Sequence, residues 1–291
     1  MKKILQLLLA LSVVAFLSCG GDEGGGGTTP EPTGIDIPTS GYTSPTSYTG
    51  YTLAWEDDFS GTSLNSNNWT HETGTGTNGW GNFELQTYQA ENTTLQDGHL
   101  IITAKEQTVG GSNYTSSRII SQNKYQFRYG RVDIRAVLPQ GKGMWPALWM
   151  LGSNFNTVGW PACGEIDIME KVGGPGLENE IHGTVHWQHG GQPANFGGSK
   201  NLSTNTTDQF HVYSIVWTPN SISWYIDDDT TPYHEINTSP ATDPEQLDEF
   251  RRSFFFIMNV AVGGTWPGSP DASTTFPQHM IVDYVRVFQE N

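Results

Sequence analysis

Cysteine is scarce in this sequence, and Cys19 and Cys163 are the only two in the chain. Cys19 ends an N-terminal apolar run, where it is a candidate for lipid attachment, and in that case Cys163 has no partner. We therefore expect a fold without a disulfide. Cys163 directly precedes a run of carboxylates whose charge opposes thiolate formation, so we interpret it as a small core-filling thiol rather than a nucleophile.

Positive charge is also scarce. The chain has 14 Lys and Arg against 30 Asp and Glu, which gives a net charge of −16 at pH 7. This balance repels nucleic acid and other anionic polymers, so we expect no nucleic-acid partner. A neutral ligand fits better, because 10 Trp and 12% aromatic residues offer rings that stack on the apolar faces of sugars.

No apolar run is long enough to span a bilayer, which takes about 20 residues. The stretch Ile4–Leu17 follows two lysines, and this pattern predicts a signal peptide over residues 1–18. The segment from Phe16 to Gly20 resembles the lipobox of bacterial lipoproteins. The resemblance implies cleavage before Cys19 and a lipid anchor there, in the bacterial cell envelope at the outer membrane, as the only membrane contact. Ordinary secretion is the alternative.

Residues 19–50 are rich in Gly, Thr, Pro and Ser and hold almost no large apolar side chain, so we expect a flexible tether. From Tyr51 to Asn291 the pattern changes to short alternating or apolar runs, such as Gly130–Val137 and Phe210–Trp217, separated by turn residues. No amphipathic helix of useful length and no internal repeat occurs. The pattern predicts one all-β domain over residues 51–291, a sandwich of two antiparallel sheets.

The densest negative charge lies on a run with strong strand propensity, Gly164-Glu-Ile-Asp-Ile-Met-Glu170. On a regular strand Glu165 and Asp167 share one face, and Glu170 lies on the other. One extra residue, a β-bulge near Ile168 to Glu170, would return Glu170 to the first face. Carboxyls this close raise one another's pKa, and a pair with separated pKa values is what glycosidic bond cleavage needs. A solvated acidic strand is the alternative.

Aromatic and polar side chains accompany this run on other predicted strands. Trp145 and Trp149 share one strand face about 13 Å apart, which suits neighbouring sugar rings in a groove, with core packing as the alternative. His182 and His186 also share a face, but about 13 Å is too far for both to bind one zinc ion, so we expect hydrogen bonds to sugar or carboxylate. Asn259 interrupts a continuously apolar run, and a buried amide there needs partners from the protein or from a bound hydroxyl.

Together these motifs resemble glycoside hydrolase family 16, in particular its laminarinase branch. The resemblance rests on five segments in the family's order: Trp145–Met150, Gly164–Glu170, His182–Trp187, Phe255–Gly268 and Asp283–Gln289. It implies a jelly-roll β-sandwich with an open substrate groove on its concave face. It also implies retaining hydrolysis, with Glu165 as nucleophile, Asp167 assisting it, and Glu170 as acid and base.

The same resemblance implies sugar contacts and a metal site. The residues that match sugar-binding positions are Asn82, Glu84, Arg118, Trp145, Trp149, His186, Asn259 and Trp266. Phe83 stands where the family often has a second Asn. Catalysis in the family needs no cofactor, but many members bind a structural calcium ion, for which Asp58 and Asp283 would supply oxygens and Gly98 its carbonyl.

The leading hypothesis is therefore a monomeric endo-β-1,3-glucanase that acts on laminarin-type glucan. Two alternatives keep the chemistry and change the polymer, to mixed-linkage β-1,3-1,4-glucan or to an agar-type galactan. The scarcity of cations disfavours a heavily sulfated substrate. A third alternative is a non-catalytic glucan-binding protein of the cell surface, which we would expect to lack one of the three carboxylates.

Overall fold

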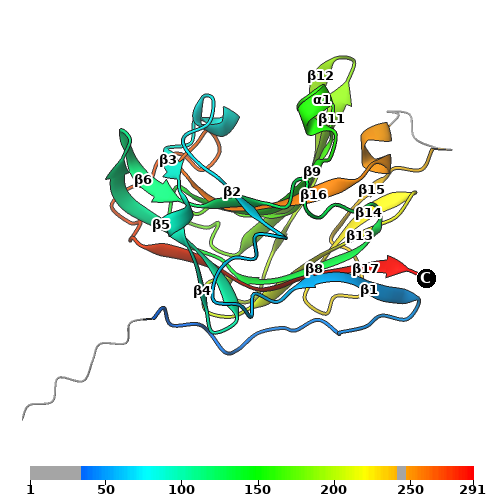
Figure 1. Cartoon of the computed structure of the whole chain (residues 1–291), viewed down its shortest axis with the longest axis horizontal. Helices are drawn as coiled ribbons and strands as arrows, with labels where there is room; N and C mark the ends of the chain where they lie inside the picture. The colour runs from blue at the N-terminus through cyan, green and yellow to red at the C-terminus, as the bar shows by residue number, and fades with distance from the viewer. Residues whose placement is uncertain (1–33, 241–246) are drawn as a thin grey trace, which may run out of the picture. The chain divides into compact units, whose positions relative to one another are not determined.

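Two β-sheets lie face to face in the computed structural model, which describes residues 34–240 and 247–291 (Figure 1). This arrangement confirms the predicted all-β sandwich. The predicted signal peptide 1–18, the lipidation site Cys19 and the first part of the tether lie outside the described residues. Within the described part of the chain, no helix has the length and apolar character needed to cross a membrane.

The larger sheet has the strand order β15-β14-β13-β8-β17-β5-β6-β3, with β1 beside β17 and β4 beside β5. Its strands are β1 (Tyr51–Asp57), β3 (Gln86–Tyr88), β4 (Thr93–Gln96), β5 (His99–Val109), β6 (Ser112–Ser116), β8 (Gly130–Val137), β13 (His211–Trp217), β14 (Ser221–Ile226), β15 (His234–Asn237) and β17 (Gln278–Glu290). One pair, β3 with β6, is parallel, so the prediction of wholly antiparallel sheets is wrong there. β4 and β6 both run antiparallel to β5, so these two strands have the same direction. The chain passes from β3 into β4 through the 3-10 turn Ala90–Asn92 without reversing, and β3 therefore runs parallel to β6.

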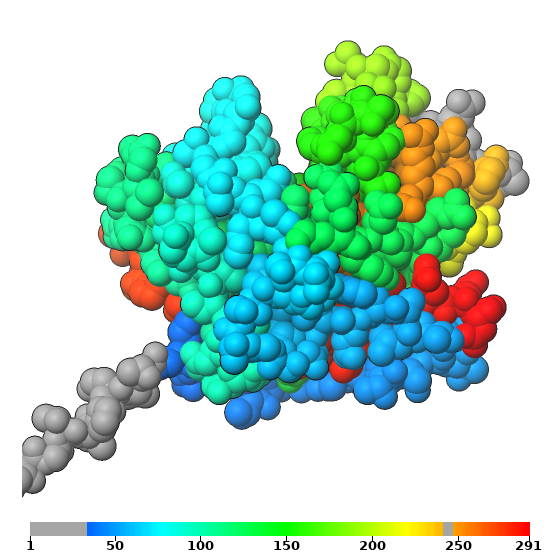
Figure 2. All heavy atoms as spheres, viewed as in Figure 1, coloured from blue at the N-terminus to red at the C-terminus, as the bar shows by residue number. Residues whose placement is uncertain are grey.

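The smaller sheet is antiparallel throughout, in the order β12-β11-β10-β9-β16-β7-β2. Its strands are β2 (Thr70–Glu72), β7 (Arg118–Ile120), β9 (Met144–Gly152), β10 (Glu165–Glu170), β11 (Glu180–His189), β12 (Gln192–Asn201) and β16 (Phe254–Val262). Figure 2 shows a notch between two lobes, and Figure 1 shows β9 and β16 at its floor. One lobe carries β3 and the other carries α1, β11 and β12, so the outer face of this sheet lines the notch.

The helical segments of residues 34–240 and 247–291 are short. They are a four-residue α-helix, α1 (Phe155–Val158), the 3-10 turns η2 (Ala90–Asn92) and η3 (Asp248–Arg251), and the π-turn η1 (Gly79–Phe83). The η1 turn contains Trp80 and Gly81 at positive φ, a conformation that departs from a regular helix. It leads directly into β3.

The sequence of β16 is almost continuously apolar because both faces of this strand are covered by other side chains. All nine of its residues are buried. Phe256 and Met258 join the main core between the sheets, while Phe255 and Ile257 join a smaller apolar cluster on the other face. That smaller cluster includes Cys163, a free and fully buried thiol, which confirms its predicted role as a core-filling residue.

The folded unit begins before Tyr51. Contacts group Asp36–Asn291 into one unit, so the boundary differs from the one expected from composition. The hydroxyl of Tyr284 bonds both the backbone N–H and the side chain of Ser44 at 2.8 Å. Tyr48 donates a 2.6 Å hydrogen bond to Asp133. Polar side chains therefore hold a segment whose few apolar residues gave no sign of packing.

Replacement of Tyr48 by Phe tests this attachment. Asp133 is fully buried and also accepts hydrogen bonds from Arg131 and Ser214, so loss of the Tyr48 hydroxyl leaves part of a buried carboxylate unsatisfied. We expect Tyr48→Phe to lower the free energy of unfolding by about 1–3 kcal/mol in denaturant melts. Tyr51→Phe is the control, because its hydroxyl lies 3.5 Å from exposed Glu290 and its loss should cost less than about 0.5 kcal/mol. Equal effects of the two substitutions would contradict the attachment.

Candidate active site

A bulge in β10 brings the three carboxylates onto one face of the smaller sheet. Asp167 lies opposite Trp149 of β9, whereas Glu170 lies opposite Ala147, so three steps along β10 match two along β9. The register with β11 shifts over the same interval. Ile168 and its neighbour Met169 both enter the main core, as expected where one residue is inserted. The predicted bulge is confirmed, and Glu170 shares the face of Glu165 and Asp167.

The strand register then aligns side chains across the floor of the notch. One row runs over five strands and contains His182, Glu170, Ala147, Asn259 and Arg118. In a parallel row Glu165 lies opposite His186 of β11. Because alternate residues of a strand face the same side, Trp145 and Trp149 lie on this face as predicted.

Nitrogen donors approach the carboxylates from the neighbouring strands. The indole N–H of Trp145 donates to Glu170 Oε1 at 2.9 Å. His186 Nε2 lies 3.2 Å from Asp167 Oδ2 and 3.6 Å from Glu165 Oε1. From the core side, Trp224 donates to the backbone carbonyl of Asp167 at 2.8 Å. His186 and Trp145 are therefore placed to influence the three carboxyls directly.

The three carboxyls resist ionisation. Burial, and then the neighbouring charge of Asp167, raise the pKa of Glu165 and of Glu170 to about 8, and burial raises the pKa of Asp167 to about 8. The Trp145 hydrogen bond acts in the opposite direction and lowers the pKa of Glu170. At neutral pH the three groups therefore share protons and titrate as a coupled set, so an acid and a base can coexist on one strand.

A second polar network fixes the floor to one wall of the notch. Trp149 donates to Asn259 Oδ1 at 2.8 Å, and the Asn259 amide donates to the hydroxyl of Tyr88 at 3.1 Å. Tyr88 in turn donates to Glu84 at 3.2 Å. Glu84 also accepts hydrogen bonds from Asn82 and Gln86. Asn259 and Glu84 thus have protein partners, and they hold Trp149 and the η1 turn in place.

Arg118 lies between two indole rings. Its guanidinium carbon is 4.6 Å from the ring centre of Trp80 and 4.8 Å from that of Trp149. Glu72 accepts a 2.5 Å hydrogen bond from its Nε. These contacts are cation–π and ion-pair interactions that fix the two tryptophans relative to each other. Arg118 therefore orients the aromatic surface of the notch, a role that its predicted sugar contact did not include.

Trp266 borders the row that contains Glu170. It is 43% exposed, and its ring makes edge contacts with Trp145 and His182 at centroid distances of 5.5 and 4.9 Å. The backbone N–H of the preceding Thr265 donates to the carbonyl of Asn82. An exposed ring held by two partly buried neighbours is a suitable surface for stacking against a sugar.

Comparison with known proteins agrees with this geometry. Residues 81–286 match the sequence model described as Glycosyl hydrolases family 16. The chain belongs to this family. It is 42% identical over 253 residues to a beta-glucanase from Rhodothermus marinus, and the aligned region covers 81% of this chain and 85% of that protein. It is 40% identical over 267 residues to glucan endo-1,3-beta-glucosidase A1 from Niallia circulans, but it spans only 38% of that longer protein.

Solved structures of family 16 members share the fold. The laminarinase catalytic domain from Thermotoga maritima MSB8 is 40% identical, with a TM-score of 0.75 over 83% of this chain and 99% of that one. The likeness confirms the predicted jelly-roll sandwich. It also confirms the family resemblance that rested on the carboxylate and tryptophan motifs.

The predicted list of site residues of this family 16 chain was incomplete. It lacked Tyr88, Glu72 and Trp80, which contact the predicted residues directly. His182, for which a hydrogen bond to sugar or carboxylate was expected, packs against Trp266. One signal could have found Tyr88, because residues 84, 86 and 88 alternate along one strand face. The ion pair of Arg118 has no such signal, since its two partners lie 46 positions apart.

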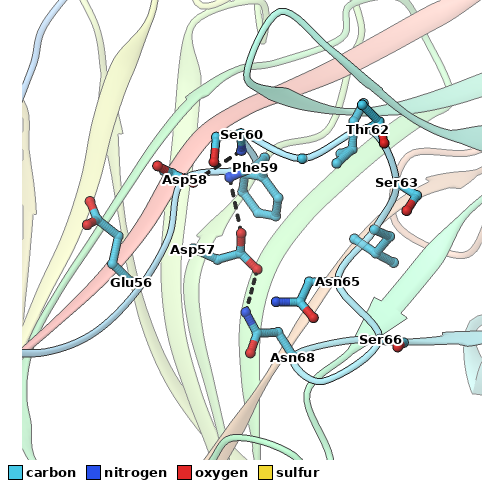
Figure 3. A pocket seen from close by; sticks show the side chains of 13 residues that line it. Glu56, Asp57, Asp58, Phe59, Ser60, Thr62, Ser63, Asn65, Ser66 and Asn68 are labelled. Carbon is cyan, nitrogen blue, oxygen red and sulfur yellow. Dashed lines mark hydrogen bonds between the residues drawn. The ribbon is translucent and has the colours of Figure 1, made fainter.

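Two of the donors predicted for calcium have protein partners in this structure. Arg135 donates to Asp283 Oδ2 at 2.7 Å, so a guanidinium already neutralises the carboxylate that calcium would need. Asp58 accepts a hydrogen bond from the backbone of Ser60 at the edge of a polar pocket of about 620 Å³ (Figure 3). The carbonyl of Gly98 would be the third ligand. Structural calcium therefore stays a prediction from the family resemblance.

Replacement of Trp145 by Phe tests its influence on Glu170. The indole N–H stabilises the ionised carboxylate, so its loss should raise the pKa of Glu170 further and keep this acid protonated to higher pH. We expect the alkaline limb of kcat/KM for glucan hydrolysis to move up by about one pH unit, the equivalent of one hydrogen bond to a charged group. Trp149→Phe is the control. The N–H lost in this variant donates to Asn259 and not to Glu170, so the alkaline limb should stay in place. A limb that moves equally in both variants would contradict the assignment.

Proposed function

We propose that this chain is an endo-acting hydrolase that cleaves the β-1,3 linkages of laminarin-type glucan with retention of configuration. The observation that carries the proposal is the bulged strand β10, which presents Glu165, Asp167 and Glu170 on the floor of an open notch. Trp145, Trp149 and their neighbours supply the aromatic lining. A notch open to solvent lets a long polymer lie across the site, which suits cleavage within the chain.

In the first step Glu165, ionised, attacks the anomeric carbon while Glu170 protonates the departing glycosidic oxygen. A covalent glycosyl ester forms on Glu165 and the C–O bond to the leaving sugar breaks. In the second step Glu170, now ionised, takes a proton from water, and the water oxygen displaces Glu165 from the anomeric carbon. Two inversions give net retention, which requires the two carboxyls to lie about 5–5.5 Å apart.

Asp167 and His186 support the charge states that this cycle requires. A proton held by Asp167 allows Glu165 to ionise beside it, since two adjacent negative charges repel. His186 Nε2 faces both groups and stabilises whichever one is ionised. Trp145 holds Glu170 in the orientation needed to reach the leaving oxygen.

The alternatives differ in substrate or in class. Mixed-linkage glucan and agar-type galactan use the same carboxylates, and product analysis on a panel of these polymers separates them from β-1,3-glucan. Arg118 is already paired with Glu72 between two indoles, which disfavours a sulfated substrate. The presence of all three carboxylates favours an enzyme over a surface glucan-binding protein.

Azide rescue distinguishes the two glutamates. Glu165→Ala and Glu170→Ala should each lower kcat on laminarin by about 10³-fold or more. With an activated aryl glucoside and azide, Glu165→Ala should form the α-azide by a single inversion and Glu170→Ala the β-azide by two. Nuclear magnetic resonance should show the β-anomer as the first wild-type product. An α-anomer first, or exchanged azide products, would overturn the assigned roles.

We also propose that the mature chain is a monomer attached to the bacterial outer membrane through lipid on Cys19. The lipobox-like sequence before Cys19 and the tether-like composition after it support this location. We expect Cys19→Ala to move the protein from the membrane fraction to the soluble fraction when the cells are fractionated. Cys163→Ala, which alters only the buried thiol, should leave the protein in the membrane fraction. Retention of Cys19→Ala in the membrane fraction would contradict the anchor.

A further inference from the structure

Three side chains at the floor of the notch, besides their proposed part in hydrolysis, have the spacing of a metal site. One oxygen each from Glu165 and Asp167 and a ring nitrogen of His186 lie within 4.8 Å of one another. His186 Nε2 is 3.2 Å from Asp167 and 3.6 Å from Glu165. Around a tetrahedral zinc ion with bonds of about 2.0–2.1 Å, ligand atoms are separated by about 3.3 Å. The two contact distances are already close to that separation.

Asp167 provides a second and independent indication. Its side chain is buried, with 2% of the residue exposed, and Oδ2 accepts no hydrogen bond. A buried carboxylate oxygen without a partner is costly. This oxygen faces His186 Nε2 at 3.2 Å but without the alignment of a hydrogen bond. A cation held between the two atoms would satisfy both.

We propose that Glu165, Asp167 and His186 bind a transition-metal dication of the Zn²⁺ type, and that the bound ion reversibly inhibits the enzyme. The donor set of two oxygens and one imidazole nitrogen suits zinc, which takes three protein ligands and leaves a fourth position open. Calcium needs six to eight oxygen ligands and magnesium needs octahedral oxygen geometry, so neither matches. Inhibition rests on the proposed function, because the ion would occupy the carboxylate of Glu165 that attacks the sugar.

The surroundings favour entry and retention of a cation. Glu165 and His186 are partly exposed, so an ion can reach them from the notch. Glu170 places a further carboxyl group on the same face, while the nearby cation Arg118 is paired with Glu72. His182 of β11 lies opposite Glu170 and packs against Trp266, so it is not one of the three proposed ligands.

Calorimetric titration of the purified chain with zinc chloride tests binding without any need for activity. Wild type should show one site that His186→Gln and Asp167→Asn each weaken at least tenfold. His182→Gln is the matched control and should bind as wild type does, while calcium and magnesium chloride should give no binding at this site. Thermal unfolding confirms that each variant is folded. Absence of the site in wild type, or unchanged affinity in both trio variants, would overturn the proposal.

A kinetic measurement then tests inhibition. Zinc should inhibit laminarin hydrolysis in competition with substrate, chelation by EDTA should restore the rate, and a β-1,3-gluco-oligosaccharide should weaken zinc binding in the calorimeter. Zinc binding at the trio without inhibition would overturn the regulatory part of the proposal. A chain that hydrolyses no glucan but binds zinc through His186 would instead contradict the proposed function alone, so the two failures are distinguishable.

Discussion

The structure depends on a single inserted residue in β10. This strand must fill the sandwich core and also carry three carboxylates on the opposite face, and strict alternation cannot meet both demands over six residues. The bulge resolves the conflict by sending Ile168 and Met169 together into the core. Glu170 then faces the notch beside Glu165 and Asp167, and the partners on β9 and β11 take their places from the shifted register.

Burial of three acidic groups is unfavourable, and the surrounding contacts offset it. Trp145 donates to Glu170, and Trp224 holds the backbone of Asp167 from the core side. Directly after the strand, fully buried Lys171 donates to the carbonyl of Pro139 and the hydroxyl of Thr206. These bonds fix the end of β10 from below, so the position of Glu170 is determined by the scaffold rather than by a mobile loop. Such rigidity suits the proton transfer proposed for Glu170.

The many short alternating runs were sufficient to predict the sandwich. The spacing of the three carboxylates along one run was sufficient to predict that a bulge would bring them onto one face, whereas their catalytic roles came from the family resemblance. Contacts between distant segments were not predictable. Ser44 and Tyr284 lie 240 positions apart. The segment around Ser44 has the composition of a tether, because it is held by polar hydrogen bonds and needs few apolar side chains. Asn259 shows the intermediate case. Its polarity within an apolar strand indicated partners, but only the fold shows that Trp149 and Tyr88 supply them.

The proposed zinc site follows from the same electrostatics as the proposed catalysis. Glycoside cleavage passes through an oxocarbenium-like transition state, so the site gains by being complementary to positive charge near the anomeric carbon. Glu165, Asp167 and Glu170 provide that complementarity before substrate arrives, at the cost of pKa values raised to about 8. A dication that reaches His186 and two of these carboxylates meets an environment already arranged for a cation. Sensitivity to zinc is thus the expected consequence of preorganisation for the transition state rather than a separate device.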